Sequence, residues 1–128
     1  MNFLDSSVII AAAVVSDANH KRAVELLSEA SKERCVITDH ILGEVATFLR
    51  KKLGSEEACG LSLRLVSNLE VVFFTRKGVL SALEIMKKYR ILSLCDALTI
   101  VAMRSLNVKR LYSFDSDFDI IEGIERIS

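Results

Sequence analysis

The chain lacks the features that mark membrane-spanning, secreted or multidomain proteins. Proline is absent, and there is no low-complexity segment, internal repeat or linker, so residues 1–128 are expected to form a single domain. The longest uninterrupted apolar run, Val8 to Val15, is far shorter than the ~20 residues of a membrane-spanning helix. The basic start of a secretory signal is also missing, because the first residues carry Asp5 and no Lys or Arg.

Cysteine is scarce and net charge is zero. Cys35, Cys59 and Cys95 are odd in number and lack the paired spacing of a disulfide framework or a zinc site, so we expect reduced thiols in a cytoplasmic protein. The 17 basic and 17 acidic residues cancel, and global charge therefore gives no support for a nucleic-acid partner. With 51% hydrophobic and 27% charged residues, the composition is globular.

Short apolar strands alternate with helices along the whole chain. Strands are expected at 2–4, 35–37, 70–74 and 110–113, with a short fifth strand at 125–127. Helices are expected at 6–15, 20–31, 39–53, 56–69, 77–89 and 94–106, and 114–119 is expected to be a loop or short turn. This alternation predicts an α/β protein with three layers, α/β/α, around a central parallel sheet of four to five short strands.

Several acidic residues follow directly after predicted strands. Asp5 ends the first strand, and either Ser6 or Ser7 is expected to cap the next helix. In open α/β sheets ligands bind outside the carboxyl ends of the strands, which makes Asp5 a site candidate. Asp115 and Asp117 follow the strand at 110–113, although Asx-rich segments after strands also form ordinary turns.

Two further acids lie on helices close to apolar residues. Asp96 stands in the apolar run from Leu94 to Met103, where an ionised carboxylate needs a cation, a metal or several donors. Ser93 and Asp96 also have capping-box spacing, so a structural role stays open. Glu44 borders the apolar face of the helix at 39–53 and could equally be a partly exposed helix glutamate.

Parallel topology would bring these acids together. Asp5 and Asp115 follow strands of one sense, Asp96 lies in the first turn of a helix, and Glu44 lies about a turn and a half into another. All four can meet at the carboxyl edge of the sheet. Carboxylates cannot crowd at neutral pH without raised pKa values or a cation, and Mg²⁺ or Mn²⁺ is the natural partner of an all-oxygen set.

Four motifs in order give the chain a family resemblance. They are Phe3-Leu4-Asp5-Ser6-Ser7, Glu44, Cys95-Asp96-Ala97 and Ser113-Phe114-Asp115-Ser116-Asp117-Phe118. With these motifs the chain resembles the PIN-domain nucleases, and among them the VapC-type toxins of toxin–antitoxin pairs, over nearly its whole length.

The resemblance implies a metal-dependent endoribonuclease with one or two Mg²⁺ or Mn²⁺ ions. Carried over by position, the acidic set would be Asp5, Glu44, Asp96 and Asp115, which would be both catalytic residues and metal ligands. Asp117 would assist as a further ligand, and Ser7 and Ser113 would support the metal or a carboxylate. A metal-activated water would cleave the phosphodiester bond and leave 5′-phosphate and 3′-hydroxyl ends.

The same resemblance implies partners: an RNA substrate, a second copy of the chain in a homodimer, and an antitoxin protein. No membrane partner is expected. Histidine acid–base catalysis is not favoured, although His40 could be a minor metal ligand or phosphate contact.

Other functions use an aspartate after the first strand. Haloacid-dehalogenase phosphatases need a second acid where Ser7 stands, and response-regulator receivers need an aspartate where Thr75 and Arg76 follow the third strand, so both fail. A non-catalytic alternative stays open. In it, a PIN-like binding or assembly domain uses its acids as caps and turns, and acts through a protein or RNA partner.

Overall fold

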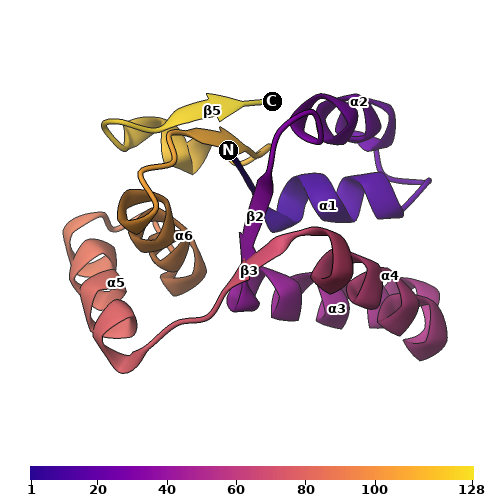
Figure 1. Ribbon diagram of the computed structural model, residues 1–128, viewed down its shortest axis with the longest axis horizontal. Helices are drawn as coiled ribbons and strands as arrows, with labels where there is room; N and C mark the ends of the chain where they lie inside the picture. Colours follow the sequence, from indigo (N-terminus) through magenta and orange to yellow (C-terminus); the bar gives the residue numbers. More distant parts are fainter.

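The computed structural model describes all 128 residues as an α/β fold (Figure 1). The strands are β1 (Asn2–Leu4), β2 (Cys35–Thr38), β3 (Glu70–Val72), β4 (Arg110–Tyr112) and β5 (Glu125–Ile127). The helices are α1 (Ser6–Ala13), α2 (His20–Ala30), α3 (Asp39–Leu53), α4 (Ser55–Asn68), α5 (Arg76–Lys88), α6 (Leu94–Ser105) and the 3₁₀-helix η1 (Ser116–Ile120).

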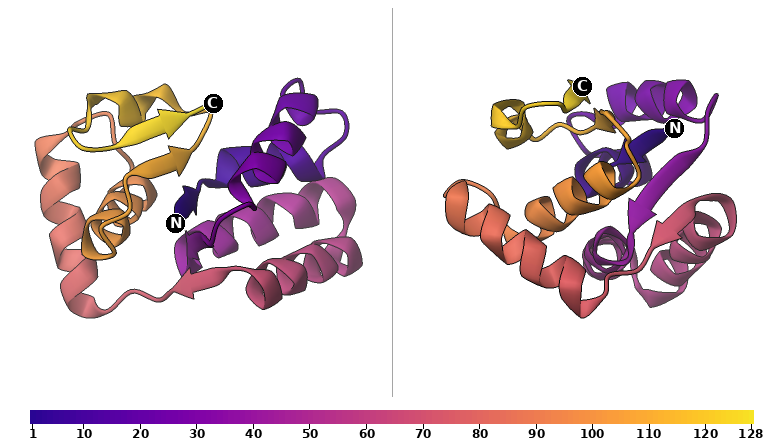
Figure 2. Two further views of the ribbon diagram at one scale, coloured as in Figure 1. Left: turned by 45° about the horizontal axis from the view of Figure 1, so that its top comes forward. Right: turned by 60° about the vertical axis from the view of Figure 1, so that its left-hand side comes forward.

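All five strands form one parallel sheet in the order β3-β2-β1-β4-β5. In Figure 1, α5 and α6 lie to the left of β2 and β3, and α1 to α4 lie to their right. The turned view on the left of Figure 2 keeps the two helix groups apart in the same way. The predicted three-layer fold with a parallel sheet, including the short fifth strand, is confirmed. No helix is both long enough and apolar enough to cross a bilayer.

Helix α3 shows why the local sequence folds as it does. The Thr38 side chain caps its start and accepts a hydrogen bond from the Ile41 N–H at 3.0 Å. Ile41, Val45 and Leu49 recur every four residues, and all three are fully buried. The helix ends at Leu53, and its C-cap is Gly54, whose φ of 90° suits a residue without a side chain.

Two predicted elements end two residues early in the structure. The strand expected at 70–74 ends at Val72, because Val72 pairs with Thr38 and β2 ends there. In the strand order β3 lies at the edge of the sheet, and its residues are half-buried. Phe73, which follows the strand, is exposed. The helix expected at 6–15 ends at Ala13, and Val15 is exposed.

The strand order places a topological switch point beside β1. The chain adds β2 and β3 on one side of β1, and then returns to add β4 and β5 on the other side. Leu4 of β1 pairs with Tyr112 of β4, and the Asp5 N–H continues the ladder to the Tyr112 carbonyl at 3.0 Å. The residues that follow these two strands lie in the crevice where open α/β sheets bind ligands.

Phe118 and Ile121 tie the segment after β4 to the core. The sequence predicts a loop or short turn here, and the structure forms η1. Phe118 is 1% exposed within the main hydrophobic core, whereas Ile120 of the same short helix is half exposed. The burial of Phe118 therefore fixes where the rest of η1 lies.

We expect Phe118→Ala to lower the free energy of unfolding by about 3–5 kcal/mol, because it removes a fully buried ring and leaves a cavity. Urea denaturation measures this change. The matched variant Ile120→Ala, in the same helix, should lower it by less than about 1 kcal/mol. Equal losses in the two variants would contradict the anchoring role of Phe118.

Candidate active site

Asp5 is the buried centre of the site. It caps α1 itself, so the expectation that Ser6 or Ser7 is the cap was wrong. Its backbone is extended, with φ −90° and ψ 155°, and its carboxylate accepts a hydrogen bond from the Ser7 N–H at 3.3 Å. Aspartate is as good an N-cap as serine, and here it comes first in the chain.

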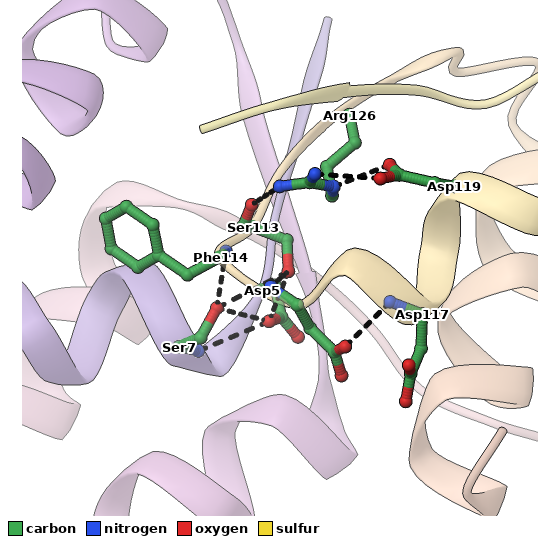
Figure 3. Close-up of polar contacts among 8 residues, drawn as sticks. Asp5, Ser7, Ser113, Phe114, Asp117, Asp119 and Arg126 are labelled. Atoms are coloured by element: carbon green, nitrogen blue, oxygen red, sulfur yellow. Dashed lines mark hydrogen bonds and ion pairs between the residues drawn. The ribbon is translucent and has the colours of Figure 1, made fainter. Parts of the chain in front are cut away.

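Two serine hydroxyls hold the same carboxylate oxygen (Figure 3). The Ser7 hydroxyl donates to Asp5 Oδ2 at 2.6 Å, and the Ser113 hydroxyl donates to it at 2.8 Å. Each hydroxyl also accepts a backbone N–H: Ser7 from Phe114 at 3.1 Å, and Ser113 from Asp115 at 3.0 Å. Asp5 Oδ2 therefore has three donors, whereas Oδ1 accepts no hydrogen bond from the protein.

Asp115 is joined to this network through its backbone and caps the next helix. Its carboxylate Oδ1 accepts a hydrogen bond from the Asp117 N–H at 2.9 Å, which starts η1. The turn role considered from the sequence is therefore present, and it uses one oxygen of Asp115. Asp117 contributes its N–H to the cluster, and its carboxylate makes no hydrogen bond or ion pair.

Asp96 combines a cap with an unfavourable electrostatic environment. It forms the capping box of α6, in which Asp96 Oδ2 accepts the Ser93 N–H at 2.9 Å and the Ser93 hydroxyl accepts the Asp96 N–H at 3.1 Å. Burial is the main cause that raises the pKa of Asp96, and the charges of Asp115 and Asp5 raise it further against the lowering effect of Ser93. Asp96 is therefore close enough to both acids to be repelled by them.

The Cys95 thiol links Glu44 to the same cluster. Glu44 lies exposed on α3. The pKa of Cys95 is raised mainly by burial, and next by the negative charge of Glu44, with smaller effects of Asp96 and Asp5. The structure thus joins Asp5 and Asp115 by hydrogen bonds through Ser113, and it places Asp96 near enough for their charges to raise its pKa further. Glu44 acts on the thiol of Cys95, the residue before Asp96.

His40 has partners of its own. Its Nδ1 lies 2.9 Å from Asp39 Oδ1, and its ring packs edge-on against Phe74, with 5.4 Å between the ring centroids. Nothing in these contacts joins His40 to the acidic cluster.

The carboxylates around the switch point are the type of ligand that a hard divalent cation binds. No three His, Cys, Asp or Glu side chains are already arranged as a metal-binding group. The capping contacts engage one oxygen each of Asp5, Asp96 and Asp115 and leave the other oxygen of each carboxylate without a protein donor. Carboxylate oxygens are the ligands that Mg²⁺ and Mn²⁺ prefer.

Sequence reasoning missed Arg126 of β5. Its guanidinium binds the Asp119 carboxylate through two hydrogen bonds of 2.7 and 2.9 Å, and donates a third to the Ser113 carbonyl at 3.1 Å (Figure 3). Arg126 thus fastens η1 and the residue after β4 to the edge of the sheet. No motif marks this contact, because it depends on the pairing of β5 with β4.

We expect Arg126→Gln to lower the melting temperature and to speed hydrogen exchange of the Asp117 amide, because η1 loses its clamp. Arg126 holds the pKa of Asp119 below its usual value. At pH values above the usual pKa of an aspartate, the pair therefore stabilises the fold. This stabilisation is lost as the pH falls through the lowered pKa of Asp119. The melting temperatures of wild type and variant should approach each other in acid.

Arg34→Gln, which breaks an exposed pair with Glu70, is the control and should change little. A pH-independent difference would contradict this account.

Comparisons with known proteins agree with the fold and with the family resemblance. The PIN domain family profile matches residues 3–124. The structure is similar to that of Mycobacterium tuberculosis VapC20, a sarcin–ricin loop cleaving toxin, with a TM-score of 0.83 and 29% identity over 93% of each chain. Comparison with curated proteins finds no significant sequence match.

More distant structures share the fold. A chain of Rickettsia felis VapBC2 bound to promoter DNA matches with a TM-score of 0.73 and 18% identity, over 98% of this chain and 96% of that one. A chain of DNA-bound VapBC from Salmonella typhimurium matches with a TM-score of 0.70 and 20% identity, over 99% and 97%. The predicted resemblance is confirmed, and the chain belongs to the PIN domain family.

Proposed function

We propose that this chain is a divalent-cation-dependent endoribonuclease and the toxin of a VapBC-type toxin–antitoxin pair. The observation that carries the proposal is the buried Asp5 at the switch point, with Asp115 joined to it through Ser113. Asp96 lies close enough for the charges of Asp115 and Asp5 to add to the effect of burial on its pKa. A PIN-domain fold that surrounds this cluster supports a nuclease.

The cation would be held by the carboxylate oxygens that the caps leave free. Asp5, Asp96 and Asp115 would supply the first ligands, and Glu44 and Asp117 would complete the set directly or through water. A bound divalent cation lowers the pKa of a coordinated water and neutralises charge on the phosphate.

The protein's own groups prepare this site. Ser7 and Ser113 hold one oxygen of Asp5, so the other oxygen keeps a fixed direction. Burial and neighbouring acids raise the pKa of Asp96, and a proton on Asp96 would compete with a cation. Cation affinity should therefore increase as the pH rises through the pKa of Asp96.

The RNA substrate is supported by the similarity to VapC20, which is described as cleaving the sarcin–ricin loop. A metal-activated water would leave 5′-phosphate and 3′-hydroxyl ends. Attack by the ribose 2′-hydroxyl would leave a cyclic phosphate instead, so analysis of the product ends distinguishes the two mechanisms.

An antitoxin partner is supported by the toxin–antitoxin complexes among the similar structures. An apolar hollow of about 320 Å³ lies between α1, α2, α3 and α4, and its walls include Ile9, Leu27, Leu61 and Leu65. A partner protein could bury apolar side chains there. A homodimer and a cytoplasmic location complete the proposal, and three free cysteines are consistent with a reducing compartment.

We expect Asp96→Asn to abolish Mn²⁺ binding, measured by calorimetry, and to reduce cleavage of labelled RNA by more than about 100-fold. Asparagine keeps an oxygen for the Ser93 N–H, so the cap of α6 survives. Without cations at neutral pH, the variant should unfold no more easily than wild type, because a repelled charge is gone. Two RNAs serve as substrates: an unstructured strand and a sarcin–ricin stem-loop.

Glu56→Gln is the matched control, since it also removes a first-turn helix carboxylate, at the start of α4. It should bind Mn²⁺ and cleave RNA like wild type. A folded wild type that binds no divalent ion at millimolar concentration would contradict the proposal. The acids would then serve as caps and turns of a non-catalytic domain.

We expect Ser113→Ala to weaken Mn²⁺ binding by roughly 10- to 100-fold, because Asp5 loses one of the donors that orient it. The Asp115 N–H also loses its acceptor, which should lower the free energy of unfolding by about 1–3 kcal/mol. Ser105→Ala, on α6, removes a hydroxyl that donates to the Ala102 carbonyl and should leave the affinity unchanged. Equal Mn²⁺ affinities of the two variants would rule out the orienting role of Ser113.

A further inference from the structure

A hollow of about 510 Å³ opens beside the acidic cluster, between α1 and α3. Its walls include Ser6 and Ile10 of α1, and Glu44, Phe48 and Lys51 of α3. Gly43 also lines the hollow, and a Cβ built there would meet no atom within 4 Å. The hollow thus begins at one of the proposed ligands and continues away from the cluster.

On the α3 side of the hollow, one helix face carries an acidic, an aromatic and a basic side chain in turn. Glu44, Phe48 and Lys51 are spaced four and three residues apart, so they lie in a row along the helix. At 1.5 Å rise per residue, the row from Glu44 to Lys51 extends ~10 Å from the acidic cluster. An acid, an aromatic ring and a cation therefore follow one another along one side of the hollow.

Phe48 and Lys51 have no evident structural task. Phe48 is 40% exposed, in contrast to Phe3 and Phe118, which are buried in the core. Lys51 is exposed and forms no ion pair. Exposed aromatic rings beside cations are the elements with which proteins bind single-stranded nucleic acids, through base stacking and phosphate contacts.

We propose that this hollow binds a single-stranded nucleotide of the RNA next to the cleaved bond, with its base on Phe48 and its phosphate on Lys51. The inference rests on the proposed nuclease function and names a specific substrate subsite for it. The mixed lining favours a nucleotide over a protein segment. The hollow at Leu61 and Leu65 is lined mostly by hydrophobic residues, so it suits an apolar protein segment better.

The test measures binding of a short fluorescein-labelled single-stranded RNA by anisotropy, in an Asp96→Asn background that does not cleave it. Phe48→Leu keeps an apolar side chain but loses the ring face, and should weaken binding roughly 5- to 150-fold. Phe48→Tyr keeps the ring and should bind like the parent. Lys51→Gln should weaken binding and reduce the slope of log affinity against log salt by about 0.7.

Matched controls come from the same chain. Phe73→Leu removes the other exposed phenylalanine, which is 71% exposed and does not line the hollow. Lys52→Gln removes the neighbouring cation of α3, which does not line it either. Both controls should keep the parent affinity and salt slope. Melting curves of all variants check that they fold.

The outcomes separate this inference from the proposed function. Wild type that cleaves RNA with Mn²⁺, while Phe48→Leu and Lys51→Gln bind no worse than their controls, overturns the subsite alone. A change of oligomeric state in Phe48→Leu at unchanged RNA affinity also overturns it, because the hollow would then be a protein interface. Wild type that neither binds nor cleaves either RNA overturns the proposed function and the subsite together.

Discussion

The buried Asp5 carboxylate is the interaction on which the structure around the switch point depends. A buried carboxylate is costly unless donors satisfy it, and Ser7 and Ser113 do so from two different segments. Asp5 and Ser113 are 108 positions apart in the chain. The hydrogen bonds of one oxygen thus join the start of α1 to the end of β4, and the backbone of Phe114 and Asp115 is held by the same two hydroxyls.

The acids of the cluster have structural and proposed chemical roles at once. Asp5 and Asp115 are the N-caps of α1 and η1, and Asp96 completes the capping box of α6, whose N-cap is Ser93. Each acid uses one carboxylate oxygen for this contact. A cap and a metal ligand are compatible, because a carboxylate has two oxygens. Burial is the main cause of the raised pKa of Asp96, and the charges of Asp115 and Asp5 add to it. A bound cation would relieve that repulsion. The caps therefore preorganise groups that are unfavourable without a ligand.

The sequence predicts the parallel sheet well, because strand–helix alternation is a local pattern with a topological consequence. Asp5 and Asp115 follow adjacent strands of that sheet, as strand-end acids are expected to do. The sequence misidentifies the cap of α1, since Asp5 and the serines after it are all good caps. Local sequence patterns predict neither the contacts of Arg126 nor the hollow at Phe48. The first depends on which strand pairs with β4, and the second on how α1 packs against α3.

The central claim is that the free oxygens of the capping acids hold a divalent cation. Anomalous diffraction at the manganese edge, from crystals soaked in Mn²⁺, tests it most directly. The account predicts a peak bounded by Asp5, Asp96 and Asp115, with the Ser7 and Ser113 hydrogen bonds to Asp5 retained. A peak elsewhere on the surface, or no peak at saturating Mn²⁺, would contradict it.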